Sequence, residues 1–280
     1  MSEAPSHFAD GAAYERLMGR WSQLVGTTFL EWLGLPQGLK WLDVGCGNGA
    51  FTETLISQNA PGEVIGIDPS EGQLAYARSR PGAKIAKFQM AGAQHLPFPD
   101  NSFDVAVMPL VITFVPDPVE AVREMKRVVR PGGTVAAYMW DIAGGGLPLE
   151  PIRAAMRSMG QDEANPPGFQ ASREDRMRAV WEQNGLTETE TRLIRIRITY
   201  ASFDDFWTSN SVPVGPSGVA IAKLSDDKKE ELKNLLRGRL PSAGDGTISY
   251  EPFANAVKGR VRLSESTPVT CPPGRAKLAT

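Results

Sequence analysis

The hydrophobic positions between residues 40 and 140 follow two alternating spacings. Short apolar runs, typical of buried strands, alternate with stretches in which apolar residues recur every three or four positions, as on one face of a helix. The predicted strands are "KWLDV", "GEVIGID", "AKIAKFQM", "FDVAVMPL" and "TVAAYMW", and the predicted helices are "FTETLISQ", "QLAYARS" and residues 119–129. This alternation is typical of an α/β protein with a parallel sheet.

Local signals predict where several helices begin and end. Ser70 and Gln73 have the S-x-x-Q spacing of a capping box, which predicts a helix start at this point. The turn "RPGG", residues 130–133, is expected to end the helix over 119–129, and Gly185 lies where a left-handed cap would end a helix in 173–185. Ser225 is expected to cap a helix in "SDDKKEELKNLLRGRL".

The pattern is looser after Asp141. "TRLIRIRIT", residues 191–199, alternates at period two and predicts a strand near the sheet edge, with "ANAVKGRVR" as its antiparallel partner. About fifty residues of helical character lie between the two, and they predict a helical lid inserted at about 201–248. The predicted organisation is an N-terminal helical segment over 1–37 that covers the ligand site, an α/β domain over 38–263 and a mobile tail over 264–280.

Composition narrows the protein class. With 41% hydrophobic and 22% charged residues, a globular soluble protein is expected, and a net charge of −2 argues against nucleic-acid binding. The basic residues near the end of the chain are interpreted as a solvated tail. Cys46 and Cys271 form neither a disulfide framework nor a metal-ligand spacing, so no metal is predicted. Because the chain shows neither a secretory signal nor a long apolar window, we expect no membrane insertion and a cytoplasmic location.

The run "LDVGCGNGAF", residues 42–51, carries the main chemical signal. Gly45, Gly47 and Ala50 fit the dinucleotide fingerprint G-x-G-x-x-G/A, but Asp43 precedes them by two residues. Its carboxylate would repel a pyrophosphate by several kcal/mol as an order of magnitude, whereas it would attract an ammonium group. Asp68, at the carboxyl end of the next predicted strand, can accept hydrogen bonds from a ribose diol. The pattern favours a nucleoside with an ammonium group and no phosphate, and S-adenosylmethionine has this composition.

Four motifs in order resemble one family. "LDVGCGNGAFT", "VIGIDPS", "AGAQHLPFPDNSFDVAV" and "REMKRVVRPGGTV" are similar to the motifs of class I S-adenosylmethionine-dependent methyltransferases of the small-molecule branch, over about residues 38–140. The resemblance implies a doubly wound, mostly parallel, seven-stranded Rossmann-like sheet with an antiparallel edge strand and a helical lid. It also implies S-adenosyl-L-methionine as cofactor and transfer of its methyl group to a small-molecule acceptor by in-line displacement.

The resemblance also implies roles for individual residues. It assigns the methionine part to Asp43 and the Gly45, Cys46 and Gly47 backbone, and the ribose to Asp68. Pro69 and Gln73 would flank the adenine, and Ala93 and Gln94, next to Gly92, would contact its edge. Met108 would line the methyl-transfer channel, and Tyr14 and Arg20 would close the site from the N-terminal segment. Two departures stand out, because relatives often have Asp in place of Gly92 and "LHH" where this chain has "ITF", with Thr113 and Phe114.

No catalytic residue is predicted. His7 lies in the N-terminal segment, and His95 follows the predicted adenine contact Gln94, where its ring is interpreted as a surface group that covers Leu96. The candidate bases for a protic acceptor are Asp141, Asp204, Asp205 and Tyr200. Trp21 is interpreted either as closing the site or as packing on the core, and Phe206 and Trp207 either as an acceptor wall or as lid core.

Two alternative functions stay open at this point. One is a non-catalytic S-adenosylmethionine-binding protein, such as a sensor or an assembly partner. The other is an NAD-dependent oxidoreductase, which would need a Tyr-Lys or His proton donor that the sequence does not offer.

Overall fold

The computed structural model describes residues 20–161, 165–213 and 215–263. Within them, seven strands form one sheet in the order β3-β2-β1-β4-β5-β9-β6. The strands are β1 (Lys40–Val44), β2 (Glu63–Asp68), β3 (Lys87–Met90), β4 (Phe103–Pro109), β5 (Val129–Trp140), β6 (Thr187–Arg195) and β9 (Phe253–Arg260). The order reverses between β1 and β4, so the crevice expected of a doubly wound sheet lies beyond the ends of these two strands.

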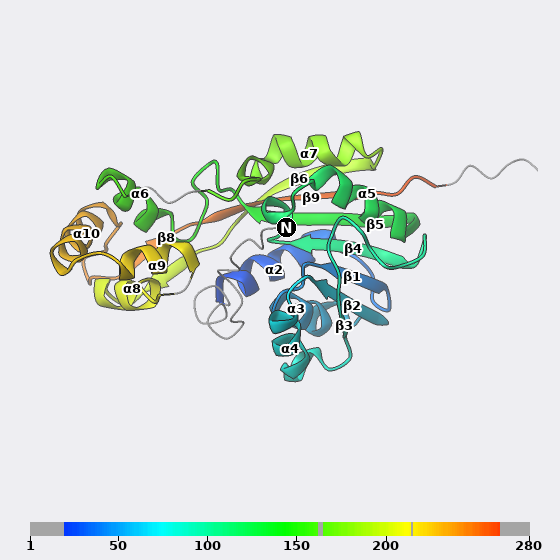
Figure 1. Cartoon of the computed structure of the whole chain (residues 1–280), viewed down its shortest axis with the longest axis horizontal. Coiled ribbons are helices and arrows are strands. Elements are labelled where there is room, and N and C mark those ends of the chain that lie inside the picture. The colour runs from blue at the N-terminus through cyan, green and yellow to red at the C-terminus, as the bar shows by residue number, and fades with distance from the viewer. Residues whose placement is uncertain (1–19, 162–164, 214, 264–280) are drawn as a thin grey trace, which may run out of the picture.

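Helices cover both faces of this sheet (Figure 1). They are α2 (Arg20–Leu33), α3 (Ala50–Asn59), α4 (Glu71–Ser79), α5 (Pro118–Val128) and α7 (Glu174–Gln183). Neighbouring residues of a central strand enter different cores, since Trp41 packs in the cluster with α2 and α3 and Leu42 packs in the cluster with α5 and α7. A strand buried on both faces explains why "KWLDV" lacks polar alternation.

A smaller lobe, here called the cap, consists of α6 and residues 198–250 and lies at one end of the molecule (Figure 1). Its elements are α6 (Glu150–Ser158), β7 (Ile198–Tyr200), α8 (Phe203–Asn210), α9 (Gly215–Ala222), α10 (Asp226–Arg239) and β8 (Ile248–Tyr250). β7 and β8 pair as a separate two-stranded sheet, and α6 packs against α10. Short 3-10 helices at Pro81–Ala83, Ile112–Phe114 and Phe169–Ser172 complete the structure.

The predicted caps are present. Ser70 Oγ accepts a hydrogen bond from Gln73 N at 3.4 Å, and Ser225 Oγ accepts one from Lys228 N, also at 3.4 Å. Gly185 has φ +68° directly after α7 and its C-cap, in the conformation that glycine adopts most readily. These local signals therefore set the boundaries of three helices.

Four strand predictions need correction. The predicted strand "TRLIRIRIT" is divided, because β6 ends at Arg195 and β7, which starts at Ile198, pairs with β8 in the cap. β3 is shorter than "AKIAKFQM", because residues 81–83 form a 3-10 helix and a turn follows. α5 ends at Val128, and "RPGG" lies inside β5, where the pairing with β4 shifts register. The antiparallel strand, β9, lies second from the edge, between β5 and β6.

Candidate functional site

The glycine loop after β1 is held against the end of β2. Gly45 N and Cys46 N both donate to Ile67 O, at 2.8 and 2.9 Å, and Gly47 N donates to Asp68 Oδ2 at 3.0 Å. Gly45 has φ +74°, and a Cβ at this position would lie 2.5 Å from Val111 Cγ2. A Cβ on Gly47 would meet no atom of the described residues within 4 Å. The loop is therefore closely packed on one side and leaves space for a ligand at Gly47.

Asp43 is the most perturbed acid of this region. Its side chain is fully buried, and Thr52 Oγ1 donates to Oδ2 at 2.6 Å. Oδ1 has no hydrogen-bond partner within the described part of the chain. The pKa of Asp43 is raised to about 7. Burial is the main cause, the Thr52 hydrogen bond lowers the pKa, and the nearby carboxylate of Asp68 raises it. A buried oxygen without a partner carries a desolvation cost that a donor on a ligand would remove.

Asp68, at the end of β2, is oriented by two backbone groups. Oδ1 accepts a hydrogen bond from Ser70 N at 2.9 Å, and Oδ2 accepts the one from Gly47 N. Burial raises the pKa of this carboxyl group, and the two hydrogen bonds lower it. Each oxygen keeps a further lone pair for a hydroxyl donor. Two carboxylates thus face the same loop, an arrangement that disfavours an anionic ligand group.

Arg80 also binds the glycine loop. Arg80 Nε donates to Asn48 O at 2.6 Å, and its guanidinium pairs with Glu53 of α3 at 2.9 Å. Glu53 in turn accepts Gly82 N at 2.9 Å. The sequence reasoning did not identify Arg80, Glu53 or Thr52, because nothing in their local spacing indicates which loop they contact.

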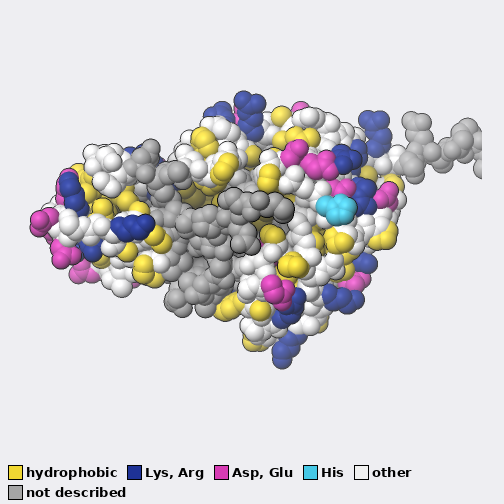
Figure 2. All heavy atoms as spheres, in the orientation of Figure 1, with side chains coloured by type: hydrophobic (Ala, Val, Ile, Leu, Met, Phe, Trp, Pro, Cys, Tyr) yellow, Lys and Arg dark blue, Asp and Glu magenta, His cyan; other side chains and the backbone are white. Residues whose placement is uncertain are grey.

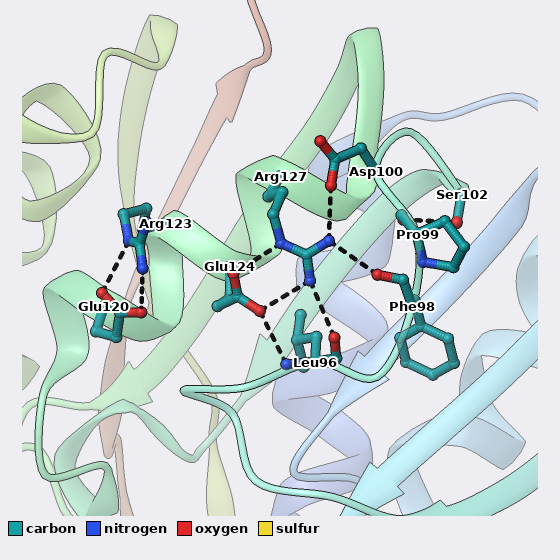
Figure 3. Close-up of polar contacts among 9 residues, drawn as sticks. All are labelled: Leu96, Phe98, Pro99, Asp100, Ser102, Glu120, Arg123, Glu124 and Arg127. Carbon is teal, nitrogen blue, oxygen red and sulfur yellow. Dashed lines mark hydrogen bonds and ion pairs between the residues drawn. The ribbon is translucent and has the colours of Figure 1, made fainter.

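The segment between β3 and β4 forms the next wall. Ala91 N donates to Asp68 O at 3.2 Å, so the segment starts beside the second carboxylate. Gly92 is exposed, Ala93 and Gln94 are half-buried, and a Cβ on Gly92 would meet no described atom within 4 Å. Glu124 and Arg127 of α5 bind the backbone of this segment at Leu96 and Phe98 (Figure 3). The predicted residues Gly92, Ala93 and Gln94 therefore lie next to Asp68 on a segment that α5 anchors.

The chain turns sharply where β4 ends. Leu110 has φ +59°, a conformation that is rare for a residue other than glycine, and its N–H donates to Tyr138 O at 2.8 Å. Such strained positions are often found at functional sites. Met108 has no exposed surface and belongs to the hydrophobic core. Met108 is the second-last residue of β4, and its predicted place in a methyl-transfer channel stays a prediction.

Other predicted residues have the following positions. Pro69 is exposed after β2, and Gln73 is buried in the first turn of α4. Cys46 is buried, and burial together with the carboxylates of Asp43 and Asp68 raises the pKa of its thiol well above the usual value, which disfavours a nucleophilic role. Tyr14 and His7 lie outside the described residues. Arg20 begins α2, and its side chain is also outside the description.

The candidate bases have structural partners. Asp205 accepts Ala201 N at 3.0 Å, Asp141 accepts Gly144 N at 2.7 Å, and Tyr200 donates to Asn210 Oδ1 at 3.4 Å. Tyr200 and Asp205 belong to the cap, and Asp204 lies beside them at the start of α8. His95 is exposed. None of these positions identifies a catalytic base.

The aromatic candidates pack into cores. Trp21 is 5% exposed and Phe206 is 1% exposed, so both belong to the buried cluster, while Trp207 is partly buried against it. Thr113 is buried, and its hydroxyl contacts Met139 Sδ at 3.7 Å, whereas Phe114 is 52% exposed. No imidazole lies among these residues at the end of β4.

Three further features of the described residues concern nucleic-acid binding, membrane insertion and metal binding. On the face drawn in Figure 2, basic and acidic side chains are intermixed over the described residues. Of the helices in the described ranges, none has both the length and the apolarity that a bilayer span requires. In the same ranges, no group of three or more His, Cys, Asp or Glu residues is arranged to hold a metal ion.

Comparisons with known proteins agree with this geometry. Residues 42–137 match the family model Methyltransf_11, described as a methyltransferase domain. The demethylmenaquinone methyltransferase of Staphylococcus aureus strain JH9 is 41% identical over 105 residues, which cover 37% of this chain and 44% of that protein. The chain thus matches less than half of the length of its curated relatives.

Solved structures show the same fold over most of the chain. The YcgJ protein of Bacillus subtilis is similar with a TM-score of 0.57 and 20% identity, covering 85% of this chain and 99% of that one. Phosphoethanolamine N-methyltransferase 2 of Haemonchus contortus, in complex with S-adenosyl-L-methionine, has a TM-score of 0.57 and 18% identity, covering 90% and 56%. The predicted resemblance and the Rossmann-like fold are confirmed.

Proposed function

We propose that this chain, whose residues 42–137 match a class I methyltransferase domain, is an S-adenosylmethionine-dependent methyltransferase that acts on a small-molecule acceptor. The observation that carries the proposal is Asp43, a fully buried carboxyl group with one oxygen lacking a hydrogen-bond partner in the described chain. A cofactor with an ammonium group supplies both a donor and a compensating charge at this point.

The residues at the strand ends fit the other parts of this cofactor. Gly47 leaves space beside the loop for the methionine part, and Asp68 presents acceptor lone pairs for the ribose hydroxyls. Gly92, Ala93 and Gln94 lie next to Asp68 and would contact the adenine. A dinucleotide would instead place its diphosphate against two carboxylates in a low-dielectric crevice, where the repulsion is several kcal/mol as an order of magnitude. The geometry therefore favours the sulfonium nucleoside over NAD.

The cofactor, when bound, supplies a methyl group on a sulfonium that is already a good leaving group. The protein then has to hold an acceptor in line with that methyl group and exclude water, and positioning of this kind can contribute several kcal/mol as an order of magnitude. A residue that accepts a proton is needed only for an acceptor that loses one. This requirement is consistent with a strand end that has Thr113 and Phe114 where relatives often have histidine.

We infer that the cap acts as the predicted lid and determines the acceptor. The match to demethylmenaquinone methyltransferase covers 105 residues, and the domain match ends at residue 137, before the cap begins. The relatives' acceptors therefore do not transfer to this chain. The cofactor contacts of Arg20 and Tyr14 stay predictions, because Tyr14 and the side chain of Arg20 lie outside the described residues.

Thermal unfolding with added ligands tests the proposed function. We expect S-adenosylmethionine and S-adenosylhomocysteine to raise Tm, with about 2.7 kcal/mol of stabilisation at a hundredfold excess over Kd, and NAD to leave Tm unchanged. The variant Asp68→Ala should lose most of the shift. A shift with NAD and none with either sulfur nucleoside would refute the assignment.

Transfer of label distinguishes an enzyme from a sensor. Incubation with methyl-labelled cofactor and a small-molecule extract should produce a labelled small product. Saturable binding without label transfer to any acceptor would favour the non-catalytic alternative.

A further inference from the structure

We propose that Glu124 and Arg127 of α5 are positioning residues that hold the segment 91–101 in the conformation that recognises the adenine ring. The inference rests on the proposed function, and it assigns a role to two residues of α5 that lie outside the glycine loop. Their contacts with the segment are drawn in Figure 3.

The pair holds both backbone polar groups of Leu96. Leu96 N donates to Glu124 Oε2 at 2.9 Å, and Arg127 Nη2 donates to Leu96 O, also at 2.9 Å. Arg127 Nη1 donates to Phe98 O and to Asp100 Oδ1, both at 2.8 Å. Two further bonds, at 2.8 and 2.9 Å, join Arg127 to Glu124 itself. One guanidinium therefore uses its donors on three points of a single segment and on the carboxylate that orients it.

The segment depends on such support. No helix or strand occurs between Met90 and Phe103, so its backbone groups lack the partners that a helix or sheet would supply. Leu96 is 2% exposed and anchors its side chain in the core, whereas Gly92, two residues before Gln94, is exposed. His95 N donates to Gly92 O at 3.3 Å, so a turn connects the anchored Leu96 to the residues beside Asp68. A displacement at Leu96 would move this turn.

A second ion pair on the same helix shows what an ordinary pair looks like. Arg123 binds Glu120 through two hydrogen bonds, at 2.5 and 2.8 Å, with the same i,i+3 spacing. The Arg123 side chain is 63% exposed, compared with 30% for Arg127, and neither member of this pair contacts the segment in Figure 3. A pair such as Glu120–Arg123 is sufficient to stabilise a helix. The additional contacts of Arg127 with residues 96–100 therefore indicate that it positions the segment.

The test compares Arg127→Lys with the matched control Arg123→Lys in the full chain. Lysine keeps the positive charge but cannot reproduce the planar fork. Hydrogen exchange without ligand should be about tenfold faster in peptides from 91–101 of Arg127→Lys, and unchanged in those of Arg123→Lys. This readout does not depend on the proposed function. Unchanged exchange in Arg127→Lys would overturn the inference.

The second readout is base discrimination, measured by calorimetry with S-adenosylhomocysteine and with S-inosylhomocysteine, in which an oxo group replaces the adenine amino group. We expect wild type and Arg123→Lys to prefer the adenine compound by about tenfold or more, and Arg127→Lys to lower this preference to about twofold. Glu124→Gln, which keeps the shape of the side chain, should give a smaller loss in the same direction. Glu124→Gln provides the same test if Arg127→Lys folds poorly.

The outcomes separate the two proposals. A lower Tm with unchanged discrimination would assign the pair a purely structural role and overturn the positioning inference alone. Equal affinity of wild type for the two compounds would also overturn the positioning inference alone, because the segment would then not recognise the base. Failure of wild type to bind either compound would refute the proposed function and this inference with it.

Discussion

The ends of β1 and β2 and the interior of the cap bury polar groups in different ways. At the strand ends, Asp43 keeps one buried oxygen without a partner in the described chain. In the cap, Tyr200 donates to Asn210, Asn210 donates to Phe206 O at 2.7 Å, and Tyr250 donates to Pro148 O at 2.9 Å. A buried group without a partner is costly, and a donor on a ligand would remove this cost at Asp43. These three polar groups of the cap are thus satisfied by the protein itself, whereas Asp43 Oδ1 at the strand ends is open to a donor on a ligand.

The largest effect is expected in the cap. Phe206 is 1% exposed, and its ring lies 5.2 Å from that of Tyr200 and 6.4 Å from that of Tyr250. Phe206→Ala should lower the free energy of unfolding by about 3–5 kcal/mol, because it leaves a cavity in this cluster. Urea denaturation measures the loss. If the two regions are independent, the affinity for S-adenosylhomocysteine stays unchanged. A large loss of affinity in a folded variant would show that the cap also forms the cofactor site.

The next effect concerns the strand ends. Asp43→Asn keeps the shape of the side chain and a group that can accept the Thr52 hydroxyl, but it removes the charge. We expect the affinity for S-adenosylhomocysteine to fall by about a hundredfold, because a charge-assisted hydrogen bond is lost in a buried site.

Asp104→Asn is the matched control for this measurement. Asp104 lies near the beginning of β4, where its carboxylate accepts Lys40 N at 2.7 Å and pairs with Arg130. Its replacement should affect stability without changing the affinity measured by calorimetry. Equal losses of affinity in the two variants would contradict the role given to Asp43.

A smaller effect tests how Asp43 is held. Between the ordinary pKa of 3.8 and about 7, the native protein keeps a proton on Asp43 that the unfolded chain has already lost. The contribution of this group to stability therefore falls as the pH rises through that window. Thr52→Val removes the donor to Oδ2 and raises the pKa further. We expect a loss of about 1–3 kcal/mol at pH 8, where Asp43 is charged, and a smaller loss at pH 5.

Thr54→Val provides the comparison for Thr52→Val. Thr54 lies on the same helix, and its hydroxyl donates to Ala50 O at 3.0 Å. Its replacement should have an effect that does not change between pH 5 and pH 8 in urea titrations. A pH-independent loss in Thr52→Val would mean that the hydroxyl does not stabilise the ionised carboxyl group.

The sequence predicted most of the core and part of the site. Period and turn signals located β1, β2, β4 and the helices that follow them, because these elements are determined locally. The division between β6 and β7 was missed, since the alternation in "TRLIRIRIT" continues through the point where the chain leaves the large sheet. Whether an alternating segment stays in one sheet depends on a partner strand that is distant in sequence.

The site shows the same limit. Asp43, Gly47 and Asp68 were predicted because their chemistry lies within two short motifs, and the structure brings them together. Glu124 and Arg127 could be predicted as an i,i+3 pair, but not as ligands of Leu96, because that contact crosses 28 and 31 residues.

The most direct test of the central claim is the number of protons released when S-adenosylhomocysteine binds at pH 6. Calorimetry in buffers of different ionisation enthalpy gives this number. Since the pKa of Asp43 is about 7 in the ligand-free protein, the carboxyl group is mostly protonated at pH 6 and must ionise to pair with an ammonium group. We predict release of about one proton by wild type and none by Asp43→Asn. Saturable binding by wild type without proton release would contradict the pairing of Asp43 with the cofactor's ammonium group.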